Sequence, residues 1–180
     1  MNLLSQAAPT FNASAIVDGT AVSDFSLAQY HGKYVVLFFY PEDFTSVCSS
    51  EVLAFQERLA DFASRDAVVI GCSTDTAERH AEYLSTPASE DGAQGVTYPL
   101  IADPDRNVSA LFGTLDGPLS AEPAPLCQRG LFILDKEGVV WFQSYHFKPI
   151  GRDLDGILRE LDAIRRLQID GKVCMAGWKG

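Results

Sequence analysis

The clearest structural signal in this chain is the run Val35-Val-Leu-Phe-Phe-Tyr-Pro41-Glu-Asp-Phe-Thr-Ser-Val-Cys48. Its first six residues are all β-branched, aliphatic or aromatic, which is typical of a strand buried on both faces. Pro41 then ends the strand, because proline has no backbone N–H to donate to a neighbouring strand. From Cys48 onward, apolar residues recur at the spacing of one helical face, at Val52, Phe55, Leu59 and Phe62. The stretch therefore predicts a buried strand over 35–40, a loop, and a helix over 48–62.

Strands and helices continue to alternate through the rest of the chain. Further strands are predicted over 67–72, 98–101, 131–134 and 139–145, and further helices over 76–84, 107–112 and 154–167. This order requires a mixed central β-sheet with helices on its faces, so the fold class is α/β. The stretch 113–127, rich in Gly, Pro and Ser, is interpreted as a loop. No repeat or linker divides residues 1–180, which predicts a single domain.

Composition and charge exclude several classes of function. The 180 residues carry 24 acidic and 14 basic side chains, a formal net charge of −10. This balance disfavours a nucleic-acid partner, because phosphate binding relies on Lys and Arg. No apolar run is long enough to span a membrane and no signal peptide is recognisable, so a cytoplasmic protein with reduced thiols is expected. The spacing of His and Cys fits no metal site and no cofactor fingerprint is present, so neither a metal nor a cofactor is expected.

The four cysteines are Cys48, Cys72, Cys127 and Cys174. No two of them form a C-x-x-C pair, which excludes a local dithiol motif and a zinc ribbon. Cys48 lies where the first turn of a helix is predicted, and the free N–H groups and partial positive charge of such a turn stabilise a thiolate. A buried, unreactive thiol is the alternative, since free cysteine is among the most buried residue types. The position of Cys48 alone leaves both interpretations open.

The motif Pro41-x-x-x-Thr45-x-x-Cys48, directly after a hydrophobic strand, resembles the active-site loop of the peroxiredoxins. The longer stretch FFYPEDFTSVCSSE (38–51) is similar to the typical 2-Cys subfamily, which includes the peroxidase component of bacterial alkyl hydroperoxide reductase. The likeness continues in RGLFILDKEGVV (129–140) and GKVCMAGWKG (171–180) and covers the chain from about Tyr30 onward. It implies a thioredoxin-like fold and a thiol-dependent peroxidase that reduces hydrogen peroxide and organic hydroperoxides.

The resemblance implies a role for each residue of the motif and for one arginine. Cys48 matches the peroxidatic cysteine, whose thiolate attacks a peroxide and becomes a sulfenic acid. Thr45 matches the hydroxyl that binds the thiolate and the peroxide, and Pro41 matches the proline that shields the sulfur from water. Arg129 matches the guanidinium that faces the thiolate and stabilises the reacting charge. Without the resemblance, Thr45, Pro41 and Arg129 would be interpreted as a helix cap, a strand terminator and a solvated strand end.

Three further residues match positions around this centre. Glu51 and Arg152 are implied to form a supporting hydrogen-bond network around the active-site arginine, although both could equally be charges at helix ends. His80 is expected to cap or pack, and it is assigned no catalytic role. Ser49 and Met175 stand where the subfamily commonly has proline; Ser49 is itself a favourable residue near a helix start.

Cys174 matches the resolving cysteine of the subfamily, which comes from the partner subunit and converts the sulfenic acid into a disulfide. The resemblance therefore implies a homodimer with intersubunit Cys48–Cys174 disulfides, a resolving segment at about 168–180, and a further ring of dimers, commonly a decamer. The reductant is implied to be a thioredoxin-like or flavoprotein-type disulfide reductant. Cys72 is expected to pack in the core. Cys127 stays open between core packing and an alternative resolving thiol.

Two other functions compete with peroxide turnover. One is an oligomeric holdase chaperone or a peroxide sensor that relays oxidation to a partner. The presence of Pro41, Thr45, Cys48 and Arg129 favours turnover, because a pure holdase would need none of them. The other is a thioredoxin-like disulfide reductase, and the absence of C-x-x-C argues against it.

Overall fold

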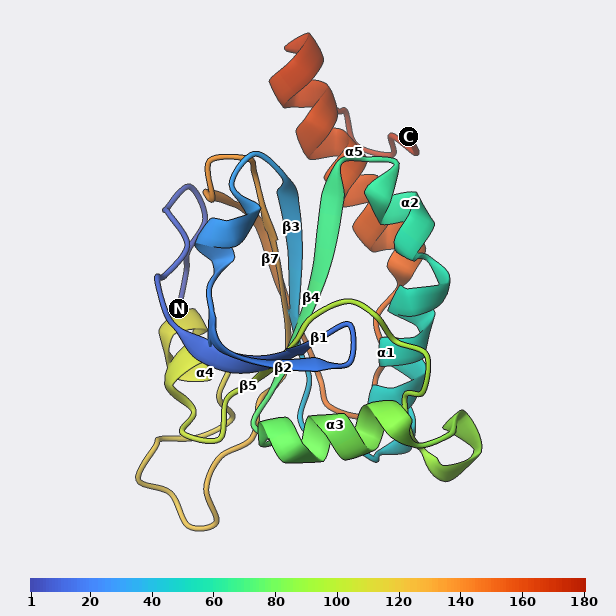
Figure 1. The fold of residues 1–180 in the computed structure, drawn as a ribbon. Helices are drawn as coiled ribbons and strands as arrows, with labels where there is room; N and C mark the ends of the chain where they lie inside the picture. Colours follow the sequence, from blue (N-terminus) through green and yellow to red (C-terminus); the bar gives the residue numbers. More distant parts are fainter.

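The computed structural model describes residues 1–180, which form one mixed sheet with helices packed against it (Figure 1). The strands are β1 (Ala13–Val17), β2 (Thr20–Phe25), β3 (Tyr34–Phe39), β4 (Ala67–Ser73), β5 (Leu100–Ala102), β6 (Arg129–Leu134) and β7 (Val140–His146). The helices are α1 (Ser46–Glu57), α2 (Leu59–Ala63), α3 (Ala77–Ser85), α4 (Asn107–Phe112) and α5 (Leu154–Asp170), with short 3-10 helices η1 (Leu27–Tyr30) and η2 (Ala88–Glu90).

Strand β3 lies in the interior of the seven-stranded sheet, whose order is β2-β1-β5-β4-β3-β6-β7. It pairs in parallel with β4 and antiparallel with β6, and all six of its residues are buried. A strand that is paired on both edges and covered on both faces has no polar side, which explains its continuous apolar run. Because β3–β4 and β4–β5 are parallel pairs and the other pairs are antiparallel, the predicted mixed α/β sheet is confirmed.

Two hydrophobic cores lie on opposite faces of this sheet. Alternate residues of β3 enter one core or the other, because successive side chains of a strand point to opposite faces. The first core also holds the apolar faces of α1, α2 and α5 and includes Cys48. The second core holds residues of α4 and the N-terminal segment and includes Cys72 and Cys127. Figure 1 shows α1, α2 and α5 on one side of the sheet and α4 on the other.

The structure differs from the predicted elements in two places. The helix predicted over 48–62 is two helices, because Arg58 leaves the helical region at φ −99° and ψ 9°; Phe62 still packs into the first core. A hairpin of β1 and β2 was not predicted. Its turn is Asp18-Gly19, both at positive φ, and an Asp-Gly pair is a strong hairpin signal that the alternation argument overlooked.

The remaining predictions of elements agree with the structure to within a few residues, and α4 coincides with the predicted helix over 107–112. Residues 113–127 form the predicted loop, with a single β-bridge between Leu115 and Cys127. None of the helices combines the length and the apolar character that crossing a membrane requires.

Candidate active site

Cys48 lies in the first turn of α1, immediately after the loop that leaves β3. Its side chain is only 1% exposed. Thr45 is the N-cap residue of α1, with extended backbone angles, so Cys48 lies in the first turn, where backbone N–H groups have no acceptor within the helix. This local arrangement follows from the sequence: Pro41 ends β3, and the loop delivers Cys48 to the start of a helix whose apolar face is held by the first core.

Arg129 directs its guanidinium at the sulfur of Cys48. Both Nη1 and Nη2 lie 3.5 Å from Sγ, and Arg129 is buried at the start of β6, the strand beside β3. Its Nε donates to the carbonyl of Lys148 at 2.6 Å, and Nη1 also donates to Glu51 Oε2 at 2.5 Å. The guanidinium is therefore held in one orientation, with its two terminal nitrogens facing the thiol.

Glu51 and Arg152 form a second, fully buried layer behind Arg129. Arg152 donates to both carboxylate oxygens of Glu51 through Nε and Nη2, each at 2.9 Å, and its backbone N–H donates to Oε1 at 2.8 Å. Its Nη1 donates to the carbonyls of Phe39 and Gly130. Burial lowers the pKa of Arg152, and the charge of Glu51 opposes that effect. Two guanidiniums share one carboxylate here, so the cluster has one unbalanced positive charge, which a thiolate at Cys48 would neutralise.

Thr45 and Pro41 flank the sulfur along the chain but do not bond to it. The hydroxyl of Thr45 donates to the carbonyl of Glu42 at 3.3 Å, and no hydrogen bond joins Thr45 to Cys48. Pro41 is buried, and its carbonyl accepts a hydrogen bond from the hydroxyl of Thr74 at 3.3 Å. The structure thus brings Cys48, Arg129, Glu51 and Arg152 into contact, and leaves Thr45 and Pro41 as neighbours of that cluster.

A buried polar network that the sequence did not reveal holds the loop before Cys48. Asp43 accepts from the hydroxyl of Tyr40 at 2.8 Å and pairs with Nδ1 of His80 at 2.7 Å, while Nε2 of His80 lies 3.1 Å from the carbonyl of Ile101. Burial lowers the pKa of His80, but its hydrogen bond to Asp43 and the charge of that residue outweigh burial and raise it above the usual value. His80 is fully buried and packs, as expected, on the loop.

The other cysteines lie away from Cys48. Cys72 and Cys127 are fully buried in the core on the opposite face of the sheet, and burial raises the pKa of Cys127 to about 12 and that of Cys72 well above its usual value. In this core the sulfur of Cys127 lies 2.9 Å from the hydroxyl of Ser109, a placement that favours core packing over a resolving role.

Cys174 follows α5 and is half-buried. Figure 1 shows the C terminus beside α5 and α2, whereas α1 begins at the other end of the molecule near α3. The structure therefore does not bring Cys48 and Cys174 of one chain together.

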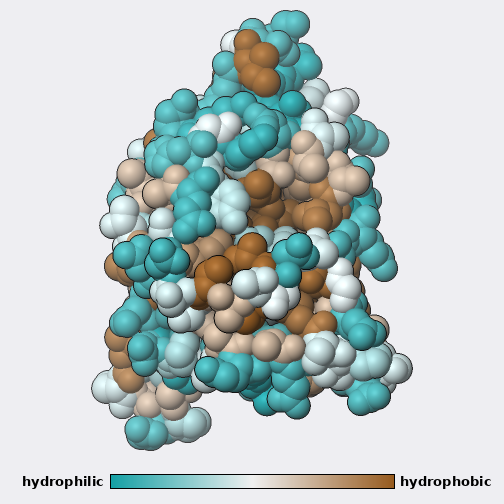
Figure 2. Space-filling view, viewed as in Figure 1, coloured by the Kyte–Doolittle hydropathy of each residue, from teal (hydrophilic) through white to brown (hydrophobic).

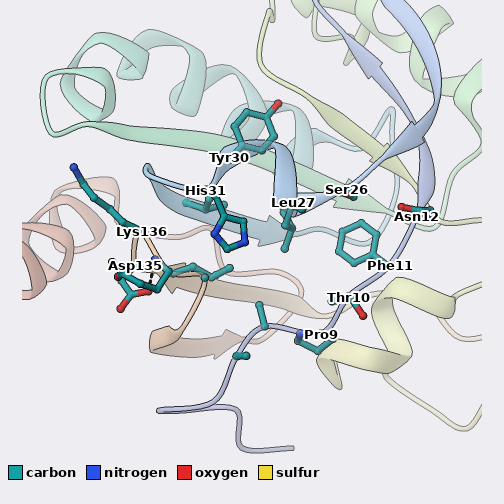
Figure 3. A pocket seen from close by; sticks show the side chains of 17 residues that line it. Pro9, Thr10, Phe11, Asn12, Ser26, Leu27, Tyr30, His31, Asp135 and Lys136 are labelled. Atoms are coloured by element: carbon teal, nitrogen blue, oxygen red, sulfur yellow. Dashed lines mark hydrogen bonds between the residues drawn. The ribbon is translucent and has the colours of Figure 1, made fainter.

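No group of three or more His, Cys, Asp or Glu side chains is arranged to hold a metal ion. A pocket of about 340 Å³ lies between the N-terminal segment, η1 and the turn that joins β6 to β7 (Figure 3). Phe11, Leu27, Tyr30 and His31 are among its lining residues, and none of the candidate site residues lines it.

Comparisons with known proteins agree with this fold. The family model described as the AhpC/TSA family matches residues 4–143. Peroxiredoxin tpx1 of Schizosaccharomyces pombe is 42% identical over 175 residues, which cover 97% of this chain and 88% of the relative. Thioredoxin peroxidase of Echinococcus granulosus is 39% identical over 177 residues, which cover 98% of this chain and 89% of the relative.

A solved structure shows the same fold over the whole chain. The reduced 2-Cys peroxiredoxin of Plasmodium vivax superposes with a TM-score of 0.91 at 31% identity, covering 99% of this chain and 90% of that one. The thioredoxin-like fold and the resemblance drawn from the sequence are confirmed. The chain belongs to the AhpC/TSA family and is a 2-Cys peroxiredoxin, a thiol-dependent peroxidase.

Proposed function

We propose that Cys48 is the peroxidatic cysteine and that Arg129 is its catalytic partner. The observation that carries the proposal is the buried guanidinium with both terminal nitrogens 3.5 Å from the sulfur. The thiolate of Cys48 attacks one peroxide oxygen, the O–O bond breaks, and the other oxygen leaves as water or an alcohol after taking up a proton. Cys48 becomes a sulfenic acid. Arg129 stabilises both the thiolate and the negative charge that moves onto the peroxide oxygens.

Thr45 and Pro41 complete the proposed site. The hydrogen bond from Thr45 to Glu42 is long, at 3.3 Å, so the hydroxyl exchanges this acceptor for a bound peroxide at little cost. Pro41 is buried and has no N–H group to hold water, which suits a role in excluding water from the thiolate. Glu51 and Arg152 keep the guanidinium of Arg129 in place through the shared carboxylate.

The proposed second step uses Cys174 of the partner subunit, carried by the segment 168–180. The sulfenic acid of Cys48 and the thiol of Cys174 condense to a disulfide and release water. The separation of the two cysteines within one chain supports a bridge between subunits (Figure 1). A thioredoxin-type protein then reduces the disulfide, which the relative named thioredoxin peroxidase supports. Since this cycle needs reduced thiols at rest, we place the protein in the cytoplasm.

An unpaired sheet edge supports the homodimer. Strand β7 is the last strand of the sheet, and a long edge strand with exposed apolar residues invites pairing with another strand. Trp141 and Tyr145 on β7 are each more than a third exposed, and Phe147 and Ile150 directly after it are 76% and 59% exposed. Hydrophobic atoms also reach the surface at the far end of α5 (Figure 2), where Ile169 is 66% exposed. We therefore propose that β7 of two subunits pair, and that such dimers assemble further into a ring, commonly a decamer.

Peroxide consumption and non-reducing gels test this proposal together. The wild type should consume hydrogen peroxide in the presence of a thioredoxin system and form a covalent dimer when peroxide is added. Cys48→Ser should lose peroxide consumption, Cys174→Ser should lose the covalent dimer, and Cys127→Ser should keep both. A covalent dimer that persists in Cys174→Ser would overturn the resolving role of that residue. No observation favours a holdase or a sensor over this function.

A further inference from the structure

A buried hydroxyl next to Cys48 takes no part in the mechanism described above. Ser49 is 4% exposed, and its Oγ donates to the backbone carbonyl of Asp91 at 2.5 Å. The same oxygen accepts a hydrogen bond from the hydroxyl of Tyr83 at 3.0 Å, and Tyr83 is fully buried. One side chain therefore ties the first turn of α1 both to α3 and to the loop that follows η2.

The acceptor carbonyl is held in place by a tightly packed turn. Asp91 adopts a left-handed conformation at φ 54°, and the N–H of the fully buried Ala93 donates to the carbonyl of Tyr83 at 2.9 Å. At Gly92 a Cβ atom would lie 2.1 Å from the carbonyl oxygen of Thr86, so only glycine fits there. This packing ties the turn to α3 and the segment after it rather than to α1, so the bond from Ser49 breaks when the first turn of α1 moves away from them.

Disulfide formation requires that movement. Cys48 is 1% exposed, whereas a disulfide needs the two sulfur atoms at bonding distance and the two Cα atoms within about 7 Å. A cysteine of another subunit cannot approach a buried sulfur, so the first turn of α1 must open. Opening breaks the backbone hydrogen bond from the N–H of Ser49 to the carbonyl of Thr45. It also separates the hydroxyl of Ser49 from its two partners, the hydroxyl of Tyr83 and the carbonyl of Asp91.

We propose that Ser49 is a positioning residue that holds the first turn of α1 closed and thereby sets how fast the Cys48 sulfenic acid reaches Cys174 of the partner. The inference rests on the proposed roles of these two cysteines. While the turn stays closed, the sulfenic acid remains beside Arg129 and meets further peroxide. A second peroxide then oxidises it to the sulfinic acid and leaves as water or an alcohol. Ser49 thus controls the division of the sulfenic acid between disulfide and sulfinic acid. Proline, the residue common at this position in the subfamily, has no side-chain hydroxyl and cannot make either bond.

The test compares Ser49→Ala with Ser50→Ala. Ser50 is the matched control, because it is exposed in the same turn and its hydroxyl donates to Val47 within α1 at 2.8 Å without reaching another segment. Rapid quenching after peroxide addition measures the rate of Cys48–Cys174 disulfide formation. This step can be told apart from the oxidation of Cys48 to the sulfenic acid, because the rate of that oxidation rises with peroxide concentration and the rate of disulfide formation does not. Mass spectrometry measures the sulfinic fraction of Cys48 under excess peroxide.

Ser49→Ala should form the disulfide between about twofold and tenfold faster, the range that the net loss of one buried hydrogen bond produces. Its sulfinic fraction should fall by a similar factor, and Ser50→Ala should match the wild type. Hydrogen exchange of the reduced protein should be faster at residues 46–49 in Ser49→Ala. Tyr83→Phe should show a smaller change in the same direction, and the double variant should be less than additive because both hydroxyls belong to one network.

Disulfide formation in Ser49→Ala at the wild-type rate, or more slowly, overturns the inference. This failure is distinguishable from a failure of the proposed function. If Cys48→Ser still consumes peroxide, or Cys174→Ser still forms the disulfide, the roles of the cysteines are wrong. If both variants behave as proposed and Ser49→Ala does not, only the role of Ser49 is wrong.

Discussion

At the scale of single residues, the site around Cys48 is governed by the balance of buried charge. Arg129 and Arg152 share the carboxylate of Glu51, and all three side chains are almost fully excluded from water. Buried charges interact strongly because little solvent screens them, and the guanidinium of Arg129 directs the unbalanced positive charge of this cluster at the adjacent sulfur. The chemistry therefore depends on the planar geometry of the guanidinium as well as on its charge.

Arg129→Lys tests that geometry. Lysine keeps the charge but offers one nitrogen where arginine presents two at 3.5 Å from the sulfur. We expect the rate of Cys48 oxidation to fall by about 100-fold, the effect of removing one aligned donor from a reacting centre. Stopped-flow measurement of the first oxidation checks this. Arg58→Lys, at a pair with Asp61 and Asp155 on the surface, is the control and should retain the wild-type rate.

The raised pKa of His80 makes stability depend on pH. A histidine whose pKa is raised by folding binds protons more tightly in the folded chain than in the unfolded chain. Protonated His80 therefore stabilises the fold fully below the unfolded pKa of about 6.5, and this stabilisation is lost as the pH rises through the pKa of His80 in the folded chain. We expect the free energy of unfolding of the wild type to fall from pH 6 toward pH 8 more steeply than that of His80→Gln. Urea denaturation at several pH values measures both slopes. His31→Gln, at an exposed histidine, should keep the wild-type slope, and equal slopes for His80→Gln and wild type would contradict the interpretation.

At the scale of secondary-structure elements, the edges of β3 and β7 have different functions. Strand β3 is paired on both sides, which fixes the loop after it and hence the start of α1. Strand β7 pairs only with β6, and its free edge continues into an exposed apolar segment. The interior strand therefore positions the chemistry, and the edge strand is the element available for association.

Phe147→Asp tests association through this edge. Phe147 is 76% exposed directly after β7, and burying such a side chain in an interface stabilises the dimer by about 1.5–3 kcal/mol. Replacing it with a charged residue should raise the dissociation constant of the dimer by more than tenfold, measured by analytical ultracentrifugation. Leu119→Asp, at a residue 56% exposed in the loop 113–127, should leave the dissociation constant unchanged. If both variants dissociate alike, the edge of β7 is not the interface.

At the scale of the whole molecule, the start of α1 and the segment after α5, which carry the two proposed catalytic thiols, lie at opposite ends of the helical layer (Figure 1). Cys48 begins α1 near α3, and Cys174 follows α5 at the opposite end (Figure 1). In the proposed two-fold dimer, Cys48 of each subunit would meet Cys174 of the other, because a symmetric interface repeats every contact twice.

Mixing Cys48→Ser with Cys174→Ser tests this arrangement. Each variant alone should form no disulfide of the proposed kind. After subunit exchange, half of the dimers are mixed and each has one complete Cys48–Cys174 pair, so roughly a quarter of the wild-type disulfide should appear. Non-reducing electrophoresis measures it. Absence of the disulfide after demonstrated exchange would falsify bridging between subunits.

Much of the fold could be predicted from residue patterns, and the exceptions have physical causes. The apolar run before Pro41 and the apolar stripe of α5 reflect which residues are buried. The spacing of apolar residues shows this burial directly, so both elements can be predicted from the sequence. The break at Arg58 leaves the apolar face in register, so periodicity cannot detect it. The hairpin at Asp18-Gly19 was overlooked because its strands are short and half-exposed.

Residue patterns along the chain are enough to predict the α/β fold, the place of Cys48 in the first turn of a helix and, through the motifs, the peroxiredoxin family, because these depend on residues that are close together along the chain. Contacts between distant segments are a matter of three-dimensional packing. The family resemblance implies that Arg129 faces the sulfur, but the position of Cys127 on the far face of the sheet and the bonds of Ser49 to Tyr83 and Asp91 are visible only in the structure. These contacts link residues tens of positions apart, and their partners are selected by strand order and by the packing of helices on the two faces of the sheet, which local sequence does not encode.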